Sequence, residues 1–520
     1  MGSKIRPVSS VPKAFGEQCR EKLVQREQLM LQDYRVNQDY PVVPECHREI
    51  LEHRRFLMEN YQLTPDLAAA CEADIGHFCR PRLEQNGRTL HCLMRNSRPT
   101  VPGAKRVSDQ CRRKLEEVVK LTGAGEDWRV DPVLQEACQP VVDVHCKDVK
   151  PGHGRVMSCL MDHVSSYHMS DNCREALLQI QYFVARDFKL DPVLYKECKT
   201  EASTYCKAKK EWHDDPSRMD PERGPIVLPC LYRYAYHPDK SVRLSKPCLY
   251  EIRRVMRQRA VSIDLHPEIE EPCMVDLASR CSDQLGPGQE MQCLQANLEK
   301  LSQECSAAVS NYTEEEAEHL ELNYPLYHTC QAVLKDLCSS ALSQDVDQGD
   351  LLKCLVDHKN NPRMKEDQAC RVSLEHFQLI SLKDYRFSFA FKQACNKDIH
   401  SFCSHVKTGA EMVGCLSKVV LDDVMNEKSP RVSPRCRNQL RVELFQREEN
   451  IKLDPKLDTA CSSDQRDFCA NVSPGEGRPH DAGCLEAVNT PSSRRHRRQD
   501  SCAPSHENCD GGDSERASRC

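Results

Sequence analysis

The sequence predicts an all-α protein, built as a tandem array of small helical cysteine-rich repeats that disulfide bonds staple together. Three observations support this fold class: the chain has 32 cysteines in 520 residues, their spacing repeats along the chain, and apolar residues surround them at helical spacing. Such cysteine usage is typical of proteins from oxidising compartments. No stretch alternates polar and apolar residues over the length of a strand, so no sheet is predicted.

The cysteines recur in groups of four. The first and second are eight residues apart, the third stands in a Cys-Leu dipeptide, and the fourth precedes the next group by 25 or 27 residues. Fixed-period self-similarity of this kind indicates a repeat architecture. The six complete groups, numbered first to sixth in chain order, are Cys71, Cys79, Cys92 and Cys111; Cys138, Cys146, Cys159 and Cys173; Cys198, Cys206, Cys230 and Cys248; Cys273, Cys281, Cys293 and Cys305; Cys330, Cys338, Cys354 and Cys370; and Cys395, Cys403, Cys415 and Cys436.

Helical periodicity predicts three helices in each repeat. The residue four after the first cysteine is apolar in all six complete repeats, as Ile75 is in the first, so it shares one helix face with the first and second cysteines. Leu115 and Val118 follow Cys111 at the same spacing. We therefore expect amphipathic helices that carry cysteine on their buried stripe.

Proline marks the joints between repeats. Asp131-Pro132 is one of several such pairs, which stand where we expect one repeat's last helix to stop and the next repeat to begin. Cys19 and Cys46 both look like fourth cysteines of incomplete repeats. We divide the chain into an unstructured segment (1–18), partial repeats (19–70), six complete repeats (71–137, 138–197, 198–272, 273–329, 330–394 and 395–460), a truncated repeat (461–485) and a disordered Arg-rich tail (486–520).

Helix geometry narrows the disulfide pairing. Two cysteines eight apart on one helix are separated by roughly 12 Å of rise, beyond the ~7 Å that a disulfide can bridge between Cα atoms. Two of the three possible connectivities remain. If the first two helices form a hairpin, the second cysteine lies near the third, and the first pairs with the fourth. We favour this nested pattern, with Cys71 bonded to Cys111 and Cys79 to Cys92.

Metal binding is the main alternative for the cysteines. Structural zinc sites usually take two ligands from a Cys-x-x-Cys segment, which occurs nowhere in the chain, and thioredoxin-like redox chemistry needs the same motif. His77, His91 and His145 stand beside repeat cysteines but do not recur in register, so we expect them to pack or face solvent. The sequence thus predicts no metal site, no cofactor and no catalytic residue.

Two glycosylation sequons are present, at Asn311 and Asn471. Thr313 and Glu316 have the spacing of a capping box, which predicts that Asn311 lies in an accessible turn before a helix. Asn471 is followed by Ser473 and a proline, a weaker context.

Charge and hydropathy exclude other classes. The chain has 73 basic and 79 acidic residues and a formal net charge of -6, which excludes a generally basic nucleic-acid binder. No apolar run approaches the ~18 residues needed to span a membrane, and the first 30 residues lack the apolar core of a signal peptide. The dense basic run from Arg494 to Arg498 fits a protease cleavage site, a glycosaminoglycan contact or a solvated tail.

The repeat pattern resembles a known family. The cysteine series, with RDFKLDP at 186–192, GRTLHCLM at 87–94 and KDYRFSFAFKQAC at 383–395, is similar to the repeats of the cysteine-rich fibroblast growth factor receptor family over about residues 19–485. The resemblance implies a type I membrane glycoprotein of the Golgi with a lumenal repeat array. It implies fibroblast growth factors as partners, recognition of a glycosylated form by E-selectin, and no catalytic residues. Glycosylation is expected at Asn311.

Residues and resemblance together predict a non-enzymatic glycoprotein of the secretory pathway, in the Golgi or outside the cell, whose repeats bind fibroblast growth factors. The alternative is a lumenal enzyme or trafficking chaperone embedded in a repeat scaffold. The long interval from Lys207 to Pro229, which contains Trp212, is a candidate contact surface. The chain departs from the family in lacking a signal peptide and membrane helix, and we interpret it as a partial or alternatively spliced form.

Overall fold

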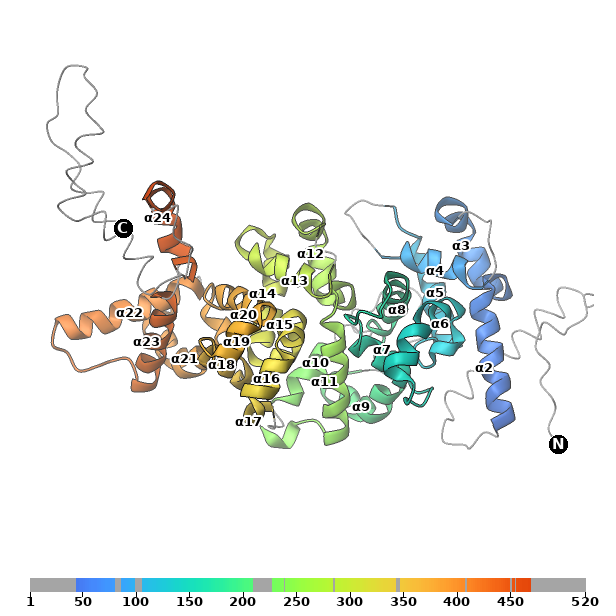
Figure 1. The fold of residues 1–520 in the computed structure, drawn as a ribbon, viewed down its shortest axis with the longest axis horizontal. Helices are drawn as coiled ribbons and strands as arrows, with labels where there is room; N and C mark the ends of the chain where they lie inside the picture. Colours follow the sequence, from blue (N-terminus) through green and yellow to red (C-terminus); the bar gives the residue numbers. More distant parts are fainter. Residues whose placement is uncertain are drawn as a thin grey trace, which may run out of the picture. The chain divides into compact units, whose positions relative to one another are not determined.

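The protein is helical throughout the part that the structure describes. Helices and turns, with no strand, form these segments, so the all-α prediction is confirmed (Figure 1). The chain divides between Val309 and Ser310 into two compact parts, the N-terminal unit and the C-terminal unit. A computed structural model describes residues 44–79, 86–98, 105–208, 227–237, 239–283, 286–342, 347–406, 409–448, 451–453 and 455–468.

The first helix of each repeat begins directly after the joint. Pro132 opens such a helix, and the Asp131 carboxylate accepts hydrogen bonds from the backbone N–H groups of Val133 (3.0 Å) and Leu134 (3.1 Å). Proline suits this position because its missing N–H would have no partner in the first turn. The joint proline therefore opens a helix rather than stopping the previous one. The first helices are α3 (Pro65–Phe78), α6 (Pro132–Val141) with its π-helical continuation η4 (Val142–Cys146), α9 (Pro192–Tyr205), α12 (Pro267–Arg280), the pair α15 (Tyr324–Thr329) and α16 (Gln331–Leu337), α21 (Phe389–Phe402) and α24 (Pro455–Phe468).

The second helix has only 8 or 9 residues in five repeats, and in four of these it begins after a left-handed glycine. Gly87 has φ 77°, a conformation that costs glycine little, and its N–H donates to the Glu59 carbonyl at the end of the preceding third helix (3.0 Å). Gly154 donates likewise to Glu126 (2.7 Å) and Gly288 to Val261 (2.8 Å), both just after the third helix, and Gly349 donates to Glu318 (2.9 Å), the last residue of α14. The second helices are α4 (Arg88–Arg95), α7 (Arg155–Asp162), α10 (Val227–Ala235), α13 (Gln289–Ala296), α18 (Asp350–Asp357) and α22 (Gly409–Met425).

The third helix carries the fourth cysteine and leads into a 3-10 turn. Its N-cap lies three residues before that cysteine: the Ser108 hydroxyl accepts from the Cys111 N–H (3.2 Å). The third helices are α2 (Pro44–Glu59), α5 (Asp109–Thr122), α8 (Asp171–Val184), α11 (Lys246–Arg259), α14 (Gln303–Glu318), α20 (Gln368–Ser381) and α23 (Pro434–Glu448). The turns are η2 (Tyr61–Leu63), η3 (Trp128–Val130), η5 (Phe188–Leu190), η7 (Ile263–Leu265), η9 (Leu320–Leu322), η10 (Tyr385–Phe387) and η11 (Ile451–Leu453).

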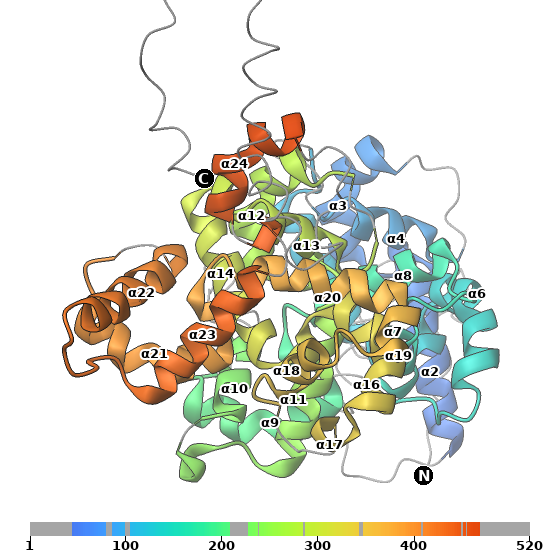
Figure 2. The same cartoon turned by 60° about the vertical axis from the view of Figure 1, so that its left-hand side comes forward.

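Each repeat builds a small core around its sulfur atoms. In the fifth repeat, Leu334, Leu355 and Phe377 pack with three of the four cysteines and are almost completely buried. In the sixth, α21, α22 and α23 contact one another and form one group (Figure 2), with Phe391 and Leu416 at its centre. Burying a large apolar side chain contributes about 2 kcal/mol, so cores of this size need the covalent bridges to hold their shape.

The glycine contact predicts a specific stability loss in Gly87→Ala. A Cβ atom there would lie 2.7 Å from the Met58 carbonyl oxygen, in a backbone conformation that side chains rarely adopt. We expect the free energy of unfolding to fall by roughly 2 to 3 kcal/mol, measured by urea denaturation of the oxidised protein.

Variants at two other glycines distinguish the cost of backbone strain from the cost of the close contact with Met58. Gly152 has φ 87° but open space around its Cβ position, so Gly152→Ala should cost only the strain, roughly 1 kcal/mol. Gly76 lies inside α3 with open space, and Gly76→Ala should stabilise by up to roughly 1 kcal/mol. Equal losses in the Gly87 and Gly152 variants would contradict the contact.

Candidate functional site

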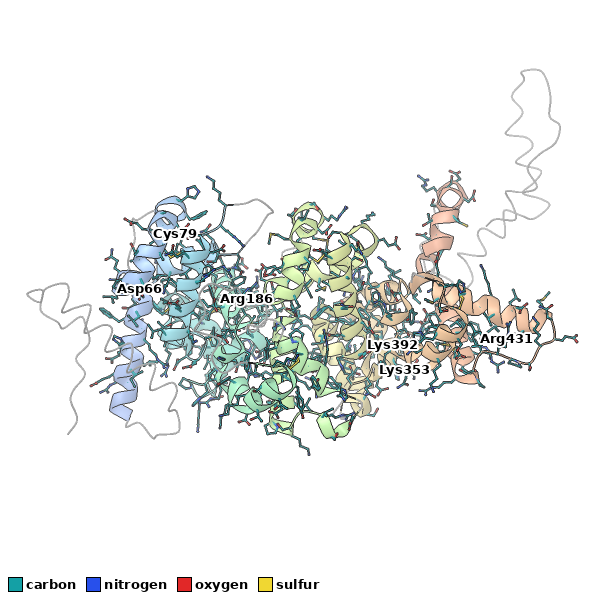
Figure 3. The ribbon with its side chains drawn as sticks, turned by 180° about the vertical axis from the view of Figure 1, so that it is seen from behind. Asp66, Cys79, Arg186, Lys353, Lys392 and Arg431 are labelled. Carbon is teal, nitrogen blue, oxygen red and sulfur yellow. A yellow bond between two sulfur atoms is a disulfide. The ribbon has the colours of Figure 1, made fainter. Side chains whose placement is uncertain are left out.

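The candidate functional feature is the linked series of repeats, and its disulfides are nested. In all six complete repeats the first cysteine bonds the fourth and the second bonds the third, which is the pattern favoured above. The Cα atoms are 4.6–4.8 Å apart in the outer pairs, such as Cys71–Cys111, and 5.8–6.1 Å apart in the inner pairs, such as Cys79–Cys92. Figure 3 labels Cys79, from an inner pair.

The two classes of disulfide differ in burial. Both sulfurs of every outer pair belong to cysteines that are 0% exposed. The third cysteine of every inner pair is half-buried, as Cys92 and Cys159 are. The outer pair thus joins the first and third helices through the centre of the repeat, while the inner pair closes the rim between the first and second helices.

A polar tie accompanies the outer disulfide. The acidic residue three after the first cysteine accepts hydrogen bonds from the serine that caps the third helix. Asp276 and Ser302 show this contact, with 2.8 Å between the Ser302 hydroxyl and the carboxylate. The other three pairs are Asp74 with Ser108 (2.7 Å), Glu201 with Ser245 (2.6 Å) and Asp398 with Ser433 (2.7 Å).

Sequence reasoning missed this tie, although the pattern is visible in the printed sequence. Serine stands three before the fourth cysteine in five of the six complete repeats, and an acidic residue stands three after the first cysteine in four. In the second and fifth repeats, Val141 and Val333 take the acidic position. Because the tie joins the same two helices as the outer disulfide, it supports the same junction.

A buried histidine joins two repeats within the N-terminal unit. His91, on α4, is 5% exposed; its Nδ1 lies 2.6 Å from Gln179 Oε1 on α8, and its Nε2 lies 2.7 Å from Asp131 Oδ2 at the start of α6. Burial opposes the charged ring, but the Asp131 carboxylate and the hydrogen bonds of Asp131 and Gln179 outweigh it and raise the pKa of His91. His91, expected to fill a packing role, is therefore a polar link between repeats.

The next junction uses the same helix position with different chemistry. Arg254 stands six residues after its fourth cysteine, as Gln179 does, and its guanidinium donates to Asp191 at the start of α9 (2.6 Å). Gln258, one turn further along α11, donates to the Ser158 hydroxyl on α7 (2.6 Å). Consecutive repeats are thus held by hydrogen bonds of unlike residues at equivalent positions.

Buried carboxylates lie where the third and fourth repeats meet. Glu270, on α12, is 4% exposed and contacts the Arg186 guanidinium; Figure 3 labels Arg186. Burial raises the pKa of Glu270 to about 7, although Arg186 opposes the shift and Asp264 adds to it. Burial likewise raises the pKa of Glu290 to about 7.

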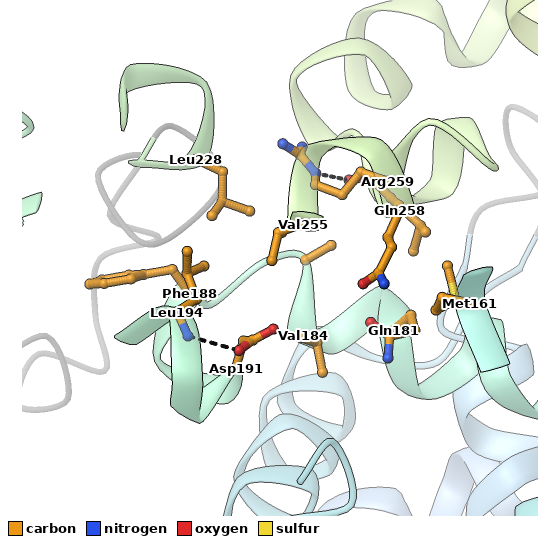
Figure 4. A pocket seen from close by; sticks show the side chains of 12 residues that line it. Met161, Gln181, Val184, Phe188, Asp191, Leu194, Leu228, Val255, Gln258 and Arg259 are labelled. Carbon is orange, nitrogen blue, oxygen red and sulfur yellow. Dashed lines mark hydrogen bonds between the residues drawn. The ribbon is translucent and has the colours of Figure 1, made fainter. Parts of the chain in front are cut away.

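A cavity between α7, α8 and α11 is too small for an organic ligand. Its interior of about 20 Å³ has room for about one water molecule. Leu228, Val255 and Phe188 line it, with Asp191 and Arg259 bonded to backbone groups of α9 and η7 at its edge (Figure 4). This cavity is a packing defect between repeats rather than a substrate pocket.

One cluster brings three potential metal-ligand atoms within 4.8 Å of one another: Cys338, Cys354 and His358. The two sulfurs are bonded to each other. Metals bind the thiolate form of cysteine, so the cluster offers only its histidine while the disulfide is intact.

The structure corrects the expectation for Asn311. Its side chain is exposed, but it lies inside α14 rather than in a turn before a helix. Thr313 is 0% exposed, and Ser302, not Thr313, stands at the start of this helix. The capping-box interpretation was wrong because Asn311 lies six residues after Cys305, well inside the third helix.

Several sequence predictions lie outside the described residues. These are Asn471, Trp212 with residues 209–226, and the Arg-rich tail. None of the described helices is both long and apolar enough to cross a bilayer.

The nested disulfides, three-helix repeats and Cys-Leu dipeptides define a tandem cysteine-rich repeat protein. The chain belongs to the cysteine rich repeat family Cys_rich_FGFR, whose model matches residues 44–100, 109–167, 171–239, 246–302, 303–363, 368–424 and 434–487. Proteins named Golgi apparatus protein 1 are similar to it: that of Cricetulus griseus is 36% identical over 509 residues, covering 89% of this chain and 43% of the relative, and the human protein is 36% identical over 509 residues, covering 89% and 42%. A "Golgi apparatus protein 1 homolog" of Caenorhabditis elegans is 35% identical over 444 residues, covering 82% and 38%. The chain spans less than half the length of these relatives. No solved structure matches significantly.

The family model divides the chain at different residues from the cysteine groups used above, so the outer disulfide joins two family repeats instead of lying within one. Each matched segment begins near a fourth cysteine and ends after a third. Cys71 therefore belongs to the segment 44–100 and its partner Cys111 to the segment 109–167. All six outer disulfides join one family repeat to the next, so the seven matched repeats are covalently linked in series.

The difference in burial predicts an order of reduction. Under mild reductant, alkylation should modify inner-pair cysteines first, because the half-buried third cysteines are open to attack and the outer pairs are covered. Peptide mass mapping after brief labelling would check this order. Equal labelling of Cys71 and Cys92 would contradict it.

The raised pKa of Glu270 predicts pH-dependent stability. A carboxyl whose folded pKa lies above its ordinary value contributes stability below pH 4.5 and loses it as pH rises to about 7. Relative to Glu270→Gln, the wild-type free energy of unfolding should fall by about 1 kcal/mol per pH unit between about pH 5 and pH 7. Denaturation curves of both proteins across this range measure the difference.

Glu299→Gln supplies the control for loss of one acidic group. Glu299 is exposed and lies in the 3-10 helix η8 (Leu298–Lys300) of the fourth repeat. A pH-independent difference between wild type and Glu270→Gln would contradict the role of Glu270.

Proposed function

We propose that the chain is a non-enzymatic glycoprotein of the secretory pathway whose cysteine-rich repeats bind fibroblast growth factors. Its membership of the Cys_rich_FGFR family carries the proposal. Twelve disulfides in the described repeats support a secretory location, because such bonds persist in oxidising compartments. The name of the relatives supports the Golgi as that location.

The linked repeats suit the binding of a protein ligand. Two disulfides hold the three helices of each repeat together, and hydrogen bonds such as that from Gln258 to Ser158 join neighbouring repeats. A surface that is already ordered loses less conformational entropy on binding. The chain between the second and third cysteines varies from a separation of 12 residues, at Cys281–Cys293, to 24, at Cys206–Cys230. Length variation at one place in a constant frame allows repeats to differ in what they contact.

Direct binding tests the function. The chain is secreted from cells behind a cleavable signal peptide so that its disulfides form, and is titrated over an immobilised fibroblast growth factor by surface plasmon resonance. We expect saturable binding that weakens at least ~10-fold after reduction and alkylation, because the cores are too thin to persist without their bridges.

A variant with a single broken outer bridge refines this experiment. Cys138→Ser with Cys173→Ser opens one bridge and leaves the remaining pairs intact. If the second repeat contacts the growth factor, this variant weakens binding; if another repeat does, binding is kept. Absence of saturable binding by the oxidised wild type would overturn the proposal.

Glycosylation of Asn311, and recognition of glycans by E-selectin, belong to the same proposal. The exposed side chain of Asn311 on α14 has room for a glycan. The secreted Asn311→Gln variant should migrate faster than the wild type by the size of one glycan, and glycosidase treatment of both proteins should abolish this difference. An unchanged ladder would show that Asn311 is unmodified, and E-selectin binding that survives complete deglycosylation would contradict glycan recognition.

A further inference from the structure

Two of the left-handed glycines that precede a second helix have an acidic residue beside them. Glu290 stands two residues after Gly288, and Asp347 stands two residues before Gly349. Each glycine donates its N–H to a carbonyl at or just after the end of the preceding third helix, and so places its acidic neighbour against the 3-10 turn that follows that helix. The other two such glycines have no acidic residue two positions before or after them: Gln85 and Thr89 flank Gly87, and Gly152 and Val156 flank Gly154.

Both carboxylates accept a hydrogen bond from the first N–H of that turn. Glu290 Oε2 lies 3.2 Å from the backbone nitrogen of Ile263, at the start of η7. Asp347 Oδ2 lies 2.9 Å from the backbone nitrogen of Leu320, at the start of η9. The other oxygen of Asp347 accepts from the Leu351 N–H on α18 (3.2 Å). Each carboxylate thus ties the turn of one repeat to the chain at the start of the next repeat's second helix.

The turns η3 and η10 are capped in a different way. Asp127 caps η3 from within the same turn, and its carboxylate is paired with the Arg129 guanidinium (2.9 and 2.7 Å). Asp384 and Arg386 repeat this arrangement at η10 (2.9 Å). A cation two residues away therefore balances the charge of each of these caps. Glu290 and Asp347 instead bring a negative charge from another repeat to a joint where acidic groups already lie.

Asp264 and Arg98 face Glu290. Arg98 follows α4 of the first repeat, and its guanidinium donates to the Asp264 carboxylate in η7 (2.6 Å). Burial raises the pKa of Glu290 to about 7, and the charge of Asp264 adds to the rise. The hydrogen bonds that Glu290 accepts and the charge of Arg98 oppose it. Glu270 faces the same pair of side chains, so this joint gathers three carboxyl groups.

Two carboxylates face Asp347, those of Glu321 in η9 and Asp350 at the start of α18. Asp347 is 7% exposed, and burial raises its pKa to about 6. The charges of Glu321 and Asp350 add to the rise, and the hydrogen bonds from the backbone oppose it. Protonation removes the repulsion, while the neutral carboxyl group keeps an oxygen that accepts from the turn. At both joints the protonated acid therefore fits the closed contact better than the ion does.

We propose that Glu290 and Asp347 are proton-operated latches between repeats, which hold their joints closed in mild acid and let them open more often at neutral pH. A closed joint that binds a proton more tightly than the open joint gains stability as the pH falls. For Glu290 this gain is complete below the ordinary pKa of 4.5 and is lost as the pH rises to about 7. For Asp347 the corresponding range runs from 3.8 to about 6.

The latches give the array a rigidity that depends on its surroundings. In a mildly acidic compartment of the secretory pathway both joints are held, and at the neutral pH outside the cell they open more often. This consequence, unlike the latches themselves, rests on the secretory location proposed above.

Hydrogen exchange of the full, oxidised chain tests the latches. Amide exchange is measured by mass spectrometry from about pH 5.5 to about pH 7.5 and divided by the intrinsic rate at each pH, so that it reports how often each turn opens. We expect residues 263–265 and 320–322 to open at least ~3-fold more often at the upper pH than at the lower. The turns η3 and η10 are internal controls and should change by less, because a guanidinium balances their caps.

Two amide variants complete the design. Glu290→Gln and Asp347→Asn keep an acceptor oxygen for the turn and remove the titrating group. Each should abolish the pH dependence at its own joint and leave it unchanged at the other, so the second joint reports in each variant whether the fold is intact. Glu299→Gln removes an exposed acidic residue of the fourth repeat and should change neither joint.

Three results would contradict the latches. A turn whose protection does not vary with pH would overturn the latch at that joint. An equal pH response at η3 and η10 would overturn the proposal and assign the effect to the whole chain. A pH response that survives in Glu290→Gln and in Asp347→Asn would overturn it too, since another group would then bind the proton.

Discussion

The outer disulfide is the constraint on which the rest of the structure depends. It crosses the centre of each repeat between the first and third helices, at cysteines that solvent does not reach. A module of some 60 residues has too little apolar surface to hold three helices in place. Closing a loop of about 40 residues contributes about 4 kcal/mol in the chain-entropy model, which is comparable with the whole stability of a small domain. The serine caps and acidic ties act at the same junction.

Between neighbouring repeats, similar backbone contacts recur, whereas the side chains that make contact differ from one junction to the next. In four repeats the glycine before the second helix donates to a backbone carbonyl at or just after the end of the preceding third helix, so a backbone contact recurs there. Side chains at an equivalent third-helix position differ: Gln179 reaches His91, whereas Arg254 reaches Asp191. In the C-terminal unit, Lys392 bridges Glu314 and Glu318 (2.5 and 2.6 Å; Lys392 is labelled in Figure 3). Backbone contacts set the spacing of repeats, and side chains give each junction its own charge.

Much of this architecture could be predicted because cysteine obeys strict geometry. An eight-residue interval on a helix cannot close a disulfide, which left two pairings to consider. The positions and hydrogen bonds of polar residues were harder to predict, because one short motif can occur in several structural contexts. Thr313 and Glu316 matched a capping box, yet the repeat register places them inside α14, where Thr313 is buried. Counting from Cys305 would have located the true start at Ser302. His91 and His145 could not be distinguished from ordinary surface histidines, because their partners come from other helices.

The nesting of crosslinks decides what a cut in the chain does. Every residue between a first and a fourth cysteine is enclosed in a covalent ring, and this includes the longest stretch between a second and third cysteine, from Cys206 to Cys230. Proteolytic nicks there leave both fragments tethered. Only a cut between a fourth cysteine and the next first cysteine, such as Cys111 to Cys138, severs the array, and that connector is a helix, a turn and another helix with Trp128 and Val130 buried. The peptide bonds whose cleavage would separate the repeats thus lie in folded helices and turns, where proteases reach them least. A molecule cut elsewhere would keep its repeats in order in a protease-rich compartment.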